Sequence, residues 1–399
     1  MLDGWAGRTA QAGMAVVLAA MVVPTAPARA AAVVVMTPTT IRAALAAVRP
    51  GDTLRMEGLF TSAILFRNRD FGGVRVDASA AIITAGLRLS RVHNLSFTGG
   101  EWRPGGSTGT GDAIRVEDSS HISFADATMT GRGTRLGNGA RIIRSSFVTV
   151  RDNLFDGLRN SLILGTTTDS LVTANRYENG GEDGMKIIDS QRMIVSHNSC
   201  TGFAPLAGYH PDCIQLWSAP NKPLQSDIYI LNNYAFGAQQ GLASFDPWQL
   251  SGARLTFAGN YVATSSPHSI TCLGCIHSRF EDNMLISLPQ APHRAMMKVT
   301  GAGTGNVFAN NDFHDLRGQF GATLPQRTLS GLIPSIAFAV GSSWEERNHA
   351  LHEEVAGMAT VDDLSGVVPE PASWTMLMLG FGVVGSRLRR QRGRRRVAA

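Results

Sequence analysis

Apolar and polar positions repeat through the middle of the chain at intervals of 22 to 28 residues, with one interval of 35. Each unit has a leading apolar residue, usually an Asn three places later, and usually another apolar residue two places after that. Repeats of this length predict stacked units, and the period-two alternation within each predicts strands. The leading residues are Phe97, Phe124, Val150, Val172, Val195, Ile230, Phe257, Phe280 and Phe308.

A second short strand opens each unit, as in residues 112–116, 183–187 and 212–216, with its apolar members inward and its polar members outward. The recurring Asn tolerates the left-handed backbone region and can bond to its counterpart in the next coil, which predicts an internal structural ladder. We therefore expect an all-β fold, a parallel β-helix solenoid of about nine or more coils. The ladder residues are Asn153, Asn175, Asn198, Asn233, Asn260, Asn283 and Asn311.

Residues 37–48 combine helix-start chemistry at Thr39 or Thr40 with helical apolar spacing, which predicts a helix that caps the open end of the solenoid. The segments 49–54 and 58–60 then look like the first strand of a β-helix. Together with the coils, residues 37–315 resemble right-handed parallel β-helix proteins of the pectin-lyase-like class. That class contains lyases, hydrolases, epimerases and noncatalytic adhesins, so the resemblance implies a fold and leaves the activity open.

The two ends of the chain are typical of an exported protein. An apolar run over residues 14–23 followed by Ala28-Arg-Ala30 predicts a signal peptide, with the mature chain beginning near Ala31. At the other end, Val368-Pro-Glu-Pro371 precedes an apolar stretch over residues 372–386 and a cluster of seven arginines.

This C-terminal order resembles the PEP-CTERM sorting signal of Gram-negative bacteria. The resemblance implies an exosortase as partner, exopolysaccharide or biofilm production, and a place in the periplasm, cell surface or extracellular matrix. The apolar stretch predicts a hydrophobic helix that anchors the chain transiently in the inner membrane, although it is shorter than the roughly 20 residues of a stable span.

We divide the chain into a signal peptide (1–30), a β-helix domain (31–319), a C-terminal cap and linker (320–367) and a sorting and anchor segment (368–399). The net charge of +5 resides at the ends, since residues 1–30 carry +1 and residues 369–399 carry +6. The remainder carries −2, and this near-neutral body argues against nucleic acid as a partner.

The unit between Val195 and Ile230 is enlarged, and loops on a rigid scaffold often carry functional sites. Alignment of its first strand with the preceding coil places Lys186 beside Gln215 and Asp183 beside Asp212, each pair about 4.8 Å apart. A polar stripe along one outer face follows. Its further members are Arg141 and Arg115, two and three coils from Lys186, with Tyr209, His210 and Trp217 at the enlarged unit.

Two chemistries fit this stripe. In β-elimination or C5 epimerisation of a uronate, Lys186 or His210 would be the base and Arg141 would neutralise the sugar carboxylate. In hydrolysis, Asp183 and Asp212 would be the carboxyl pair, near the roughly 5 to 5.5 Å of a retaining enzyme. In the structural alternative, the two Asp residues continue a bend ladder with Asn138 and Asn160, and the other polar residues are ordinary surface groups.

Aromatic side chains beside the enlarged coil could stack on sugar faces, or could pack the long loops. The tripeptide 245–247 resembles one found in alginate epimerases, with Trp248 in place of the His that normally follows. The predicted catalytic residues are Lys186, His210, Asp212 and Asp183; the predicted substrate-binding residues are Arg141, Arg115, Gln215, Tyr209, Trp217 and Trp248.

We thus expect an exported, surface-associated lyase, epimerase or hydrolase that acts on an acidic exopolysaccharide. The alternative is a noncatalytic β-helix protein that binds or organises exopolysaccharide. No cofactor or metal is expected, and no recognisable ligand loop supports calcium.

The four cysteines are compatible with export. Cys200 falls on an inward position, where a buried thiol is the simplest interpretation, although a bridge to Cys213 is open if their Cα atoms come within about 7 Å. Cys272 and Cys275 have the spacing of half a zinc site, but no second pair exists, which favours a local disulfide.

Overall fold

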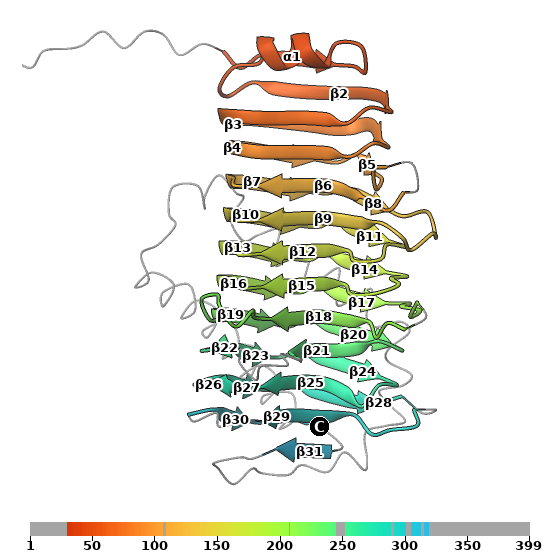
Figure 1. Ribbon diagram of the computed structural model, residues 1–399, viewed down its shortest axis with the longest axis vertical. Helices are drawn as coiled ribbons and strands as arrows, with labels where there is room; N and C mark the ends of the chain where they lie inside the picture. Colours follow the sequence, from red (N-terminus) through yellow and green to blue (C-terminus); the bar gives the residue numbers. More distant parts are fainter. Residues whose placement is uncertain are drawn as a thin grey trace, which may run out of the picture.

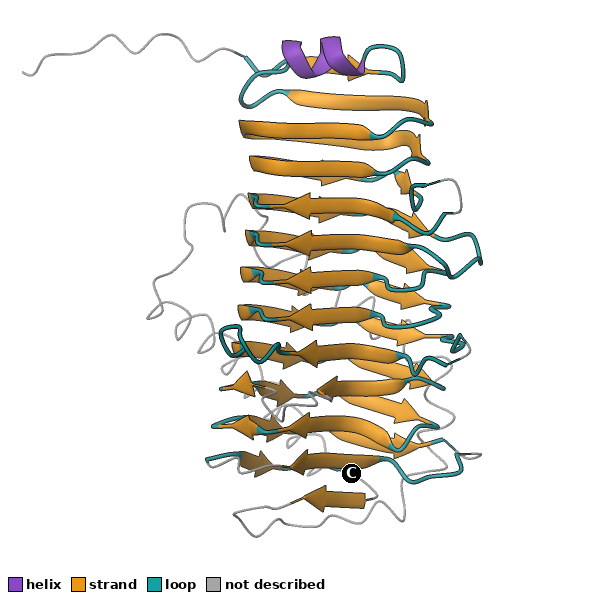
Figure 2. Cartoon of the chain, viewed as in Figure 1, coloured by secondary structure: helices purple, strands orange, loops and turns teal. Residues whose placement is uncertain are grey.

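The computed structural model describes residues 30–106, 109–206, 208–244, 252–288, 291–300, 305–312 and 315–318. Its strands stack into a single parallel β-helix, as Figures 1 and 2 show. Each strand pairs in parallel with its counterparts in the coils before and after it, for example β6 with β4 and β9. The predicted all-β parallel solenoid is confirmed.

The first coils contain a short helix and the longest strands. The helix α1 lies across the N-terminal end of the stack and is preceded by Thr40 as its N-cap residue, as predicted (Figure 1). Arg69 fastens the helix by donating hydrogen bonds to the carbonyl oxygens of Leu45 and Val48. The elements here are β1 (Val33–Met36), α1 (Ile41–Ala47), β2 (Thr53–Phe60), β3 (Ile64–Ile83) and β4 (Leu87–Thr98).

Three columns of strands form the sides of the following coils, and the first column carries the candidate site (Figure 1). The first column consists of β6 (Asp112–Glu117), β9 (Asn138–Ile143), β12 (Leu162–Gly165), β15 (Met185–Ile188), β18 (Asp212–Trp217), β21 (Gln240–Ser244), β25 (His268–Leu273), β29 (Met296–Thr300) and β31 (Asp315–Gly318). The second consists of β7 (Ser120–Ala125), β10 (Ser146–Arg151), β13 (Thr168–Thr173), β16 (Gln191–Ser196), β19 (Ser226–Leu231), β22 (Gly252–Ala253), β23 (Thr256–Ala258), β26 (Cys275–Ile276), β27 (Arg279–Glu281) and β30 (Val307–Ala309). The third consists of β5 (Glu101–Trp102), β8 (Thr128–Thr130), β11 (Leu154–Asp156), β14 (Arg176–Glu178), β17 (Ser199–Thr201), β20 (Tyr234–Gly237), β24 (Tyr261–Thr264) and β28 (Met284–Ser287).

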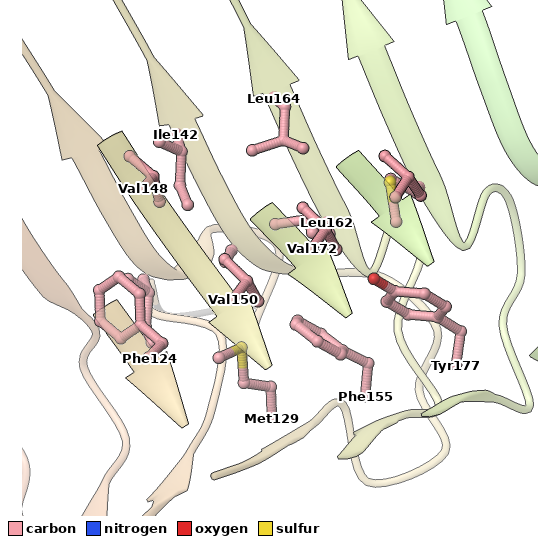
Figure 3. Packing of buried hydrophobic residues seen from close by; sticks show 14 of the residues in the cluster. Phe124, Met129, Ile142, Val148, Val150, Phe155, Leu162, Leu164, Val172 and Tyr177 are labelled. Atoms are coloured by element: carbon pink, nitrogen blue, oxygen red, sulfur yellow. The ribbon is translucent and has the colours of Figure 1, made fainter. Parts of the chain in front are cut away.

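The leading apolar residues pair with one another in register from coil to coil, from Phe97 through to Phe308. Their side chains point into the interior and meet those of the other two columns, as Figure 3 shows for the middle coils. Aromatic rings stack along the axis where the repeat provides them, with ring centroids 5.1 Å apart for Phe257 and Phe280. Burial of this continuous apolar column stabilises the stack.

The predicted asparagine ladder runs through the interior. The side-chain amide of Asn198 donates to Oδ1 of Asn233 at 3.0 Å, and Asn233 donates to Asn260 at 3.1 Å. Each Oδ1 also accepts the backbone N–H of the preceding member, as from Asn198 to Asn233. Every amide therefore acts as both donor and acceptor, which allows these polar side chains to be buried.

The cysteines form two disulfides. Cys200 bonds to Cys213 with 5.5 Å between their Cα atoms, so the expectation of a buried thiol at Cys200 was wrong. Cys200 on β17 and Cys213 on β18 are both fully buried, and their side chains meet in the interior. Cys272 and Cys275 form a local disulfide.

Several predictions concern residues outside the described part of the chain. These are the signal peptide, the cap and linker at 320–367, the hydrophobic C-terminal helix, and Trp248 with the tripeptide before it.

Candidate functional site

The enlarged coil places the predicted stripe on the outer side of the first column. Lys186 on β15 pairs in register with Gln215 on β18. Arg141 and Arg115 occupy the same register position two and three coils away, with Ile163 between Arg141 and Lys186. The alignment predicted from the sequence is confirmed.

Three residues before this column, a second column of polar residues lines the bend where each first-column strand begins. Asn138 donates to Asp112 at 2.9 Å, and Asn160 donates to Asn138 at 3.1 Å. Asp183 and Asp212 continue this column, as the structural alternative proposed, and Oδ1 of Asp183 accepts the backbone N–H of Asp212 at 2.8 Å. We call these five residues the outer ladder.

Three further groups tie the outer ladder to charges on the surface. Lys186 Nζ lies 2.7 Å from Oε1 of Glu182 and 3.0 Å from Oδ2 of Asp183. Arg159 Nε lies 2.6 Å from the other oxygen of Glu182, which also accepts from the Asn160 amide at 3.1 Å. Lys186 is thus held between two carboxylates.

These contacts fix the charges of Lys186 and Glu182. Partial burial lowers the pKa of Lys186, but its carboxylate neighbours Asp183 and Glu182 outweigh burial and raise the pKa above its usual value. Burial likewise raises the pKa of Glu182, while Lys186 and Arg159 outweigh it and leave the pKa low. At neutral pH the amine is therefore a cation, an arrangement that favours charge pairing over a role as a base.

Asp183 and Asp212 are shut off from solvent, with side chains 2% and 0% exposed. Burial, and then the charge of Asp183, raises the pKa of Asp212 well above its ordinary value. Burial also raises the pKa of Asp183, against the opposing pull of Lys186. Gln215 donates to Oδ2 of Asp212 at 2.8 Å, while Oδ1 has no hydrogen-bond partner among the described residues. Because two adjacent buried carboxylates repel, the pKa of Asp212 rises further than that of Asp183, which Lys186 holds down.

The exposed groups above this pair are His210, Tyr209 and Trp217. His210 is 65% exposed, and its Nδ1 lies 3.9 Å from Oδ2 of Asp212. It lines a pocket of about 230 Å³ together with Gln215, Leu216 and Trp217. The hydroxyl of Tyr209 accepts a hydrogen bond from Arg159 at 3.1 Å, and the guanidinium lies over the tyrosine ring. His210 and the aromatic side chain of Trp217 thus line one pocket, while Tyr209, next to His210 in the chain, is held against Arg159.

Two of the predicted arginines face the other end of the stripe. Arg141 Nε bonds both oxygens of Asp112, at 3.2 and 3.1 Å, and Arg115 pairs with Glu117 at 2.7 Å. They therefore lie in the predicted column but several coils away from His210.

Glu182 and Arg159 belong to the cluster but were not among the predicted site residues. Each lies one residue before an outer-ladder member, Asp183 and Asn160 respectively, and their repeat positions therefore coincide. The equivalent repeat positions of Arg159 and Glu182 in the sequence could therefore have predicted a salt bridge between neighbouring coils.

The described residues contain no group of three His, Cys, Asp or Glu side chains placed to hold a metal ion. Nor does any helix in this part of the chain have the length and apolar character needed to cross a membrane.

Comparison with known proteins supports the fold and the sorting signal. Residues 367–395 match the PEP-CTERM protein-sorting motif, which indicates export to the cell envelope or surface and processing by an exosortase. No significant match to a curated protein sequence is found.

Two solved structures illustrate the shared fold. A DFA-IIIase from Arthrobacter chlorophenolicus A6, in complex with DFA-III, has a TM-score of 0.51 at 12% identity, over 78% of this chain and 87% of its own. The A-module of the mannuronan C-5 epimerase AlgE4 from Azotobacter vinelandii has a TM-score of 0.51 at 11% identity, over 73% of this chain and 94% of its own. At these identities the similarity shows a pectin-lyase-like β-helix fold.

Proposed function

We propose that this protein is an exported enzyme that removes the C5 proton from a uronate residue of an exopolysaccharide, with β-elimination or C5 epimerisation as the result. The observation that carries the proposal is the difference in exposure at the site. His210 and Tyr209 are 65% and 42% exposed, whereas both candidate carboxyls are buried.

This difference separates the two chemistries that fit the sequence. A glycosidase needs two carboxyl groups that both face the scissile bond. Asp183 and Asp212 are buried, and Asp183 is already engaged by Lys186 and by a backbone N–H. Proton abstraction needs one exposed base near fixed positive charge, which His210 and Lys186 supply.

In the proposed reaction, the imidazole of His210 takes the C5 proton, and the carboxyl of Asp212, whose Oδ2 faces Nδ1 of the ring, holds the imidazole with its other nitrogen towards the sugar. Lys186 and Gln215 face the sugar carboxylate and stabilise the negative charge that develops on it. In elimination, the C5 electron pair forms the C4=C5 double bond as the C4–O bond breaks, and Tyr209 protonates the departing oxygen. In epimerisation, Tyr209 returns a proton to the opposite face of C5. In both cases solvent restores the proton of Tyr209 and takes up the proton that His210 has gained.

The fold and the sorting motif are consistent with this activity. The mannuronan C-5 epimerase that shares the fold shows that a β-helix can support chemistry at C5. In our proposal the hydrophobic C-terminal segment holds the chain transiently in the inner membrane until an exosortase processes it. Trp217, and Trp248 outside the described residues, would stack on neighbouring sugars.

Exchange of the C5 proton with deuterium tests the proposal, because elimination and epimerisation both require it. We expect the protein in D2O to incorporate deuterium into alginate, polygalacturonate or glucuronan, with unsaturated ends measured by ultraviolet absorbance if it is a lyase. His210→Ala should reduce the rate by about 10² to 10⁴. His277→Ala, which removes another exposed histidine, on the turn before β27, should leave the rate unchanged.

One observation favours a noncatalytic protein that binds exopolysaccharide. Asp183 and Asp212 continue a ladder that begins with Asp112 and two asparagines, and such a ladder is sufficient to stabilise bends. Binding of a polymer without deuterium incorporation and without new reducing ends would support this alternative. New reducing ends without deuterium incorporation would identify a hydrolase instead.

A further inference from the structure

A pocket of about 350 Å³ is lined by residues of β3, β4 and β6, and its Arg88 and Arg115 belong to the same outward column as Arg141. These strands lie near the N-terminal end of the stack (Figure 1). Four arginines and one carboxylate line it, so its charge is positive. None of these pocket arginines contacts the cluster around His210. The charged lining residues are Arg67, Arg88, Arg91, Arg115 and Glu117.

The backbone register concentrates this positive charge. Arg88 on β4 lies directly opposite Arg115 on β6, which in turn lies opposite Arg141 on β9. Like charges opposite one another on neighbouring strands destabilise a sheet. Asp112 and Glu117 compensate Arg115 and Arg141.

Arg67 and Arg88 differ from these two arginines. Both are exposed, and no carboxylate among the described residues forms an ion pair with either of them. Two guanidinium groups at one opening offer the planar donor pairs that match carboxylate, sulfate or phosphate oxygens.

We propose that this pocket is a second binding site, in which Arg67 and Arg88 hold an acidic group of a polyanionic glycan. Four register steps separate Arg88 from Lys186. At about 4.8 Å for each step, the two sites lie roughly 19 Å apart along the face. A glycan must therefore be several sugars long to occupy both sites. The idea that one glycan chain occupies both sites rests on the proposed function. Binding of an anion in the pocket does not depend on it.

The double variant Arg67→Gln/Arg88→Gln tests the site. In affinity electrophoresis through gels that contain polygalacturonate or alginate, we expect its dissociation constant to rise about tenfold over that of the unmodified protein. A matched variant, Arg42→Gln/Arg294→Gln, removes the same charge from two exposed arginines elsewhere and should bind as the unmodified protein does. Equal weakening in both variants would overturn the proposal, because net charge alone would then explain binding.

Further measurements separate the ligand sources and the two sites. Inorganic phosphate and phosphatidylglycerol vesicles are tested alongside the polymers, and a loss of vesicle binding with unchanged polymer binding would overturn the assignment to a glycan. His210→Ala should retain polymer binding even if the proposed reaction is absent. If the reaction occurs, the double variant should raise KM for long polymers and leave kcat on short oligosaccharides unchanged. An unchanged KM for long polymers would overturn the bridging of the two sites.

Discussion

Two stacks of polar side chains run through the same coils, and they differ in what they can bond. The interior ladder consists of amides, and each one both donates to and accepts from its neighbours. The outer ladder contains the carboxyl of Asp112 and the amides of Asn138 and Asn160, followed by two adjacent carboxyls at Asp183 and Asp212. Both stacks carry one side chain per coil, and they differ in residue type at Asp183 and Asp212.

An ionised carboxyl accepts hydrogen bonds but cannot donate one, and two neighbouring carboxylates repel each other. Asparagine at either position would continue the outer ladder without this cost, as it does at Asn138 and Asn160. Stacking therefore does not require Asp183 and Asp212. Buried acids that lower stability in this way are typical of functional sites, where activity offsets the loss.

The largest expected effect comes from replacing the acid of the outer ladder with an amide. Asp212→Asn should lower the rate of C5 proton exchange by about 100-fold or more, because the new amide can present its NH2 group to Nδ1 of His210 and select the wrong tautomer of the ring. The same change should raise the free energy of unfolding at pH 7, because it removes the repulsion by Asp183. Rates and urea denaturation measure the two effects.

A matched control for this change is Asp227→Asn, which removes an acid paired with Arg254 on the second column. It should leave the exchange rate unchanged and give no gain in stability. If Asp212→Asn instead unfolds the protein and spares the rate of the folded fraction, the outer ladder is structural throughout.

In the interior ladder we expect the opposite pattern. Asn260→Ala removes the oxygen that accepts both the backbone N–H and the side-chain amide of Asn233. Two buried donors without acceptors cost about 1 to 3 kcal/mol each, so the free energy of unfolding should fall by roughly 3 to 4 kcal/mol. The C5 exchange rate per folded molecule should stay within about twofold of the original. A large loss of rate without loss of stability would contradict the separation of the two ladders.

Much of this architecture could be predicted from the sequence because the repeat specifies the register. The extra residues between Val195 and Ile230 lie on both sides of residues 212–216, so the pairing of Lys186 with Gln215 follows from aligning the apolar alternation of 212–216 with that of 183–187. The interior asparagines are predictable for the same reason, since each side chain bonds to the same atom one coil away.

The burial and the hydrogen-bond partners of the site residues could not be predicted from the repeat. Counting residues places Asp183 beside Asp212, but it does not show that Gln215 contacts Asp212 or that both carboxyls are buried. The exposure of these side chains depends on the way in which the long loops fold over the strands, and the loop sequences do not follow the repeat. The bridge from Cys200 to Cys213 was left open for a related reason, because the sequence fixes the coil but not the distance between side chains.

That disulfide connects the two regions under comparison. Cys200 takes the inward position that Phe155 and Tyr177 hold in earlier coils, and Cys213 follows Asp212 in β18. Cys200→Ala/Cys213→Ala should lower the free energy of unfolding by about 2 to 3 kcal/mol, as expected for a loop of this size. Thermal unfolding checks this value. Reduction with dithiothreitol should destabilise the unmodified protein but not the double variant, apart from any effect of the Cys272–Cys275 bridge.

The smallest expected effect is a pH dependence that distinguishes the two ladders. The folded-state pKa of Asp212 lies well above the value of an unfolded Asp, because of burial and the charge of Asp183. Between these two pKa values the folded chain retains a proton that the unfolded chain has lost. This group's contribution to stability is therefore fully present below the unfolded value, near pH 4, and is lost as the pH rises towards the folded value.

Other carboxylates act in the opposite direction, since pairing with Lys186 and Arg159 leaves the pKa of Glu182 low. The informative quantity is thus the difference between the unmodified protein and Asp212→Asn, measured by urea denaturation from pH 4 upward. We expect the advantage of the Asn variant to grow as the pH rises through this range. Asn260→Ala should show a difference that does not change with pH, because its ladder contains no titrating group. A constant difference for Asp212→Asn would mean that burial and Asp183 do not raise the pKa of Asp212 in the folded state.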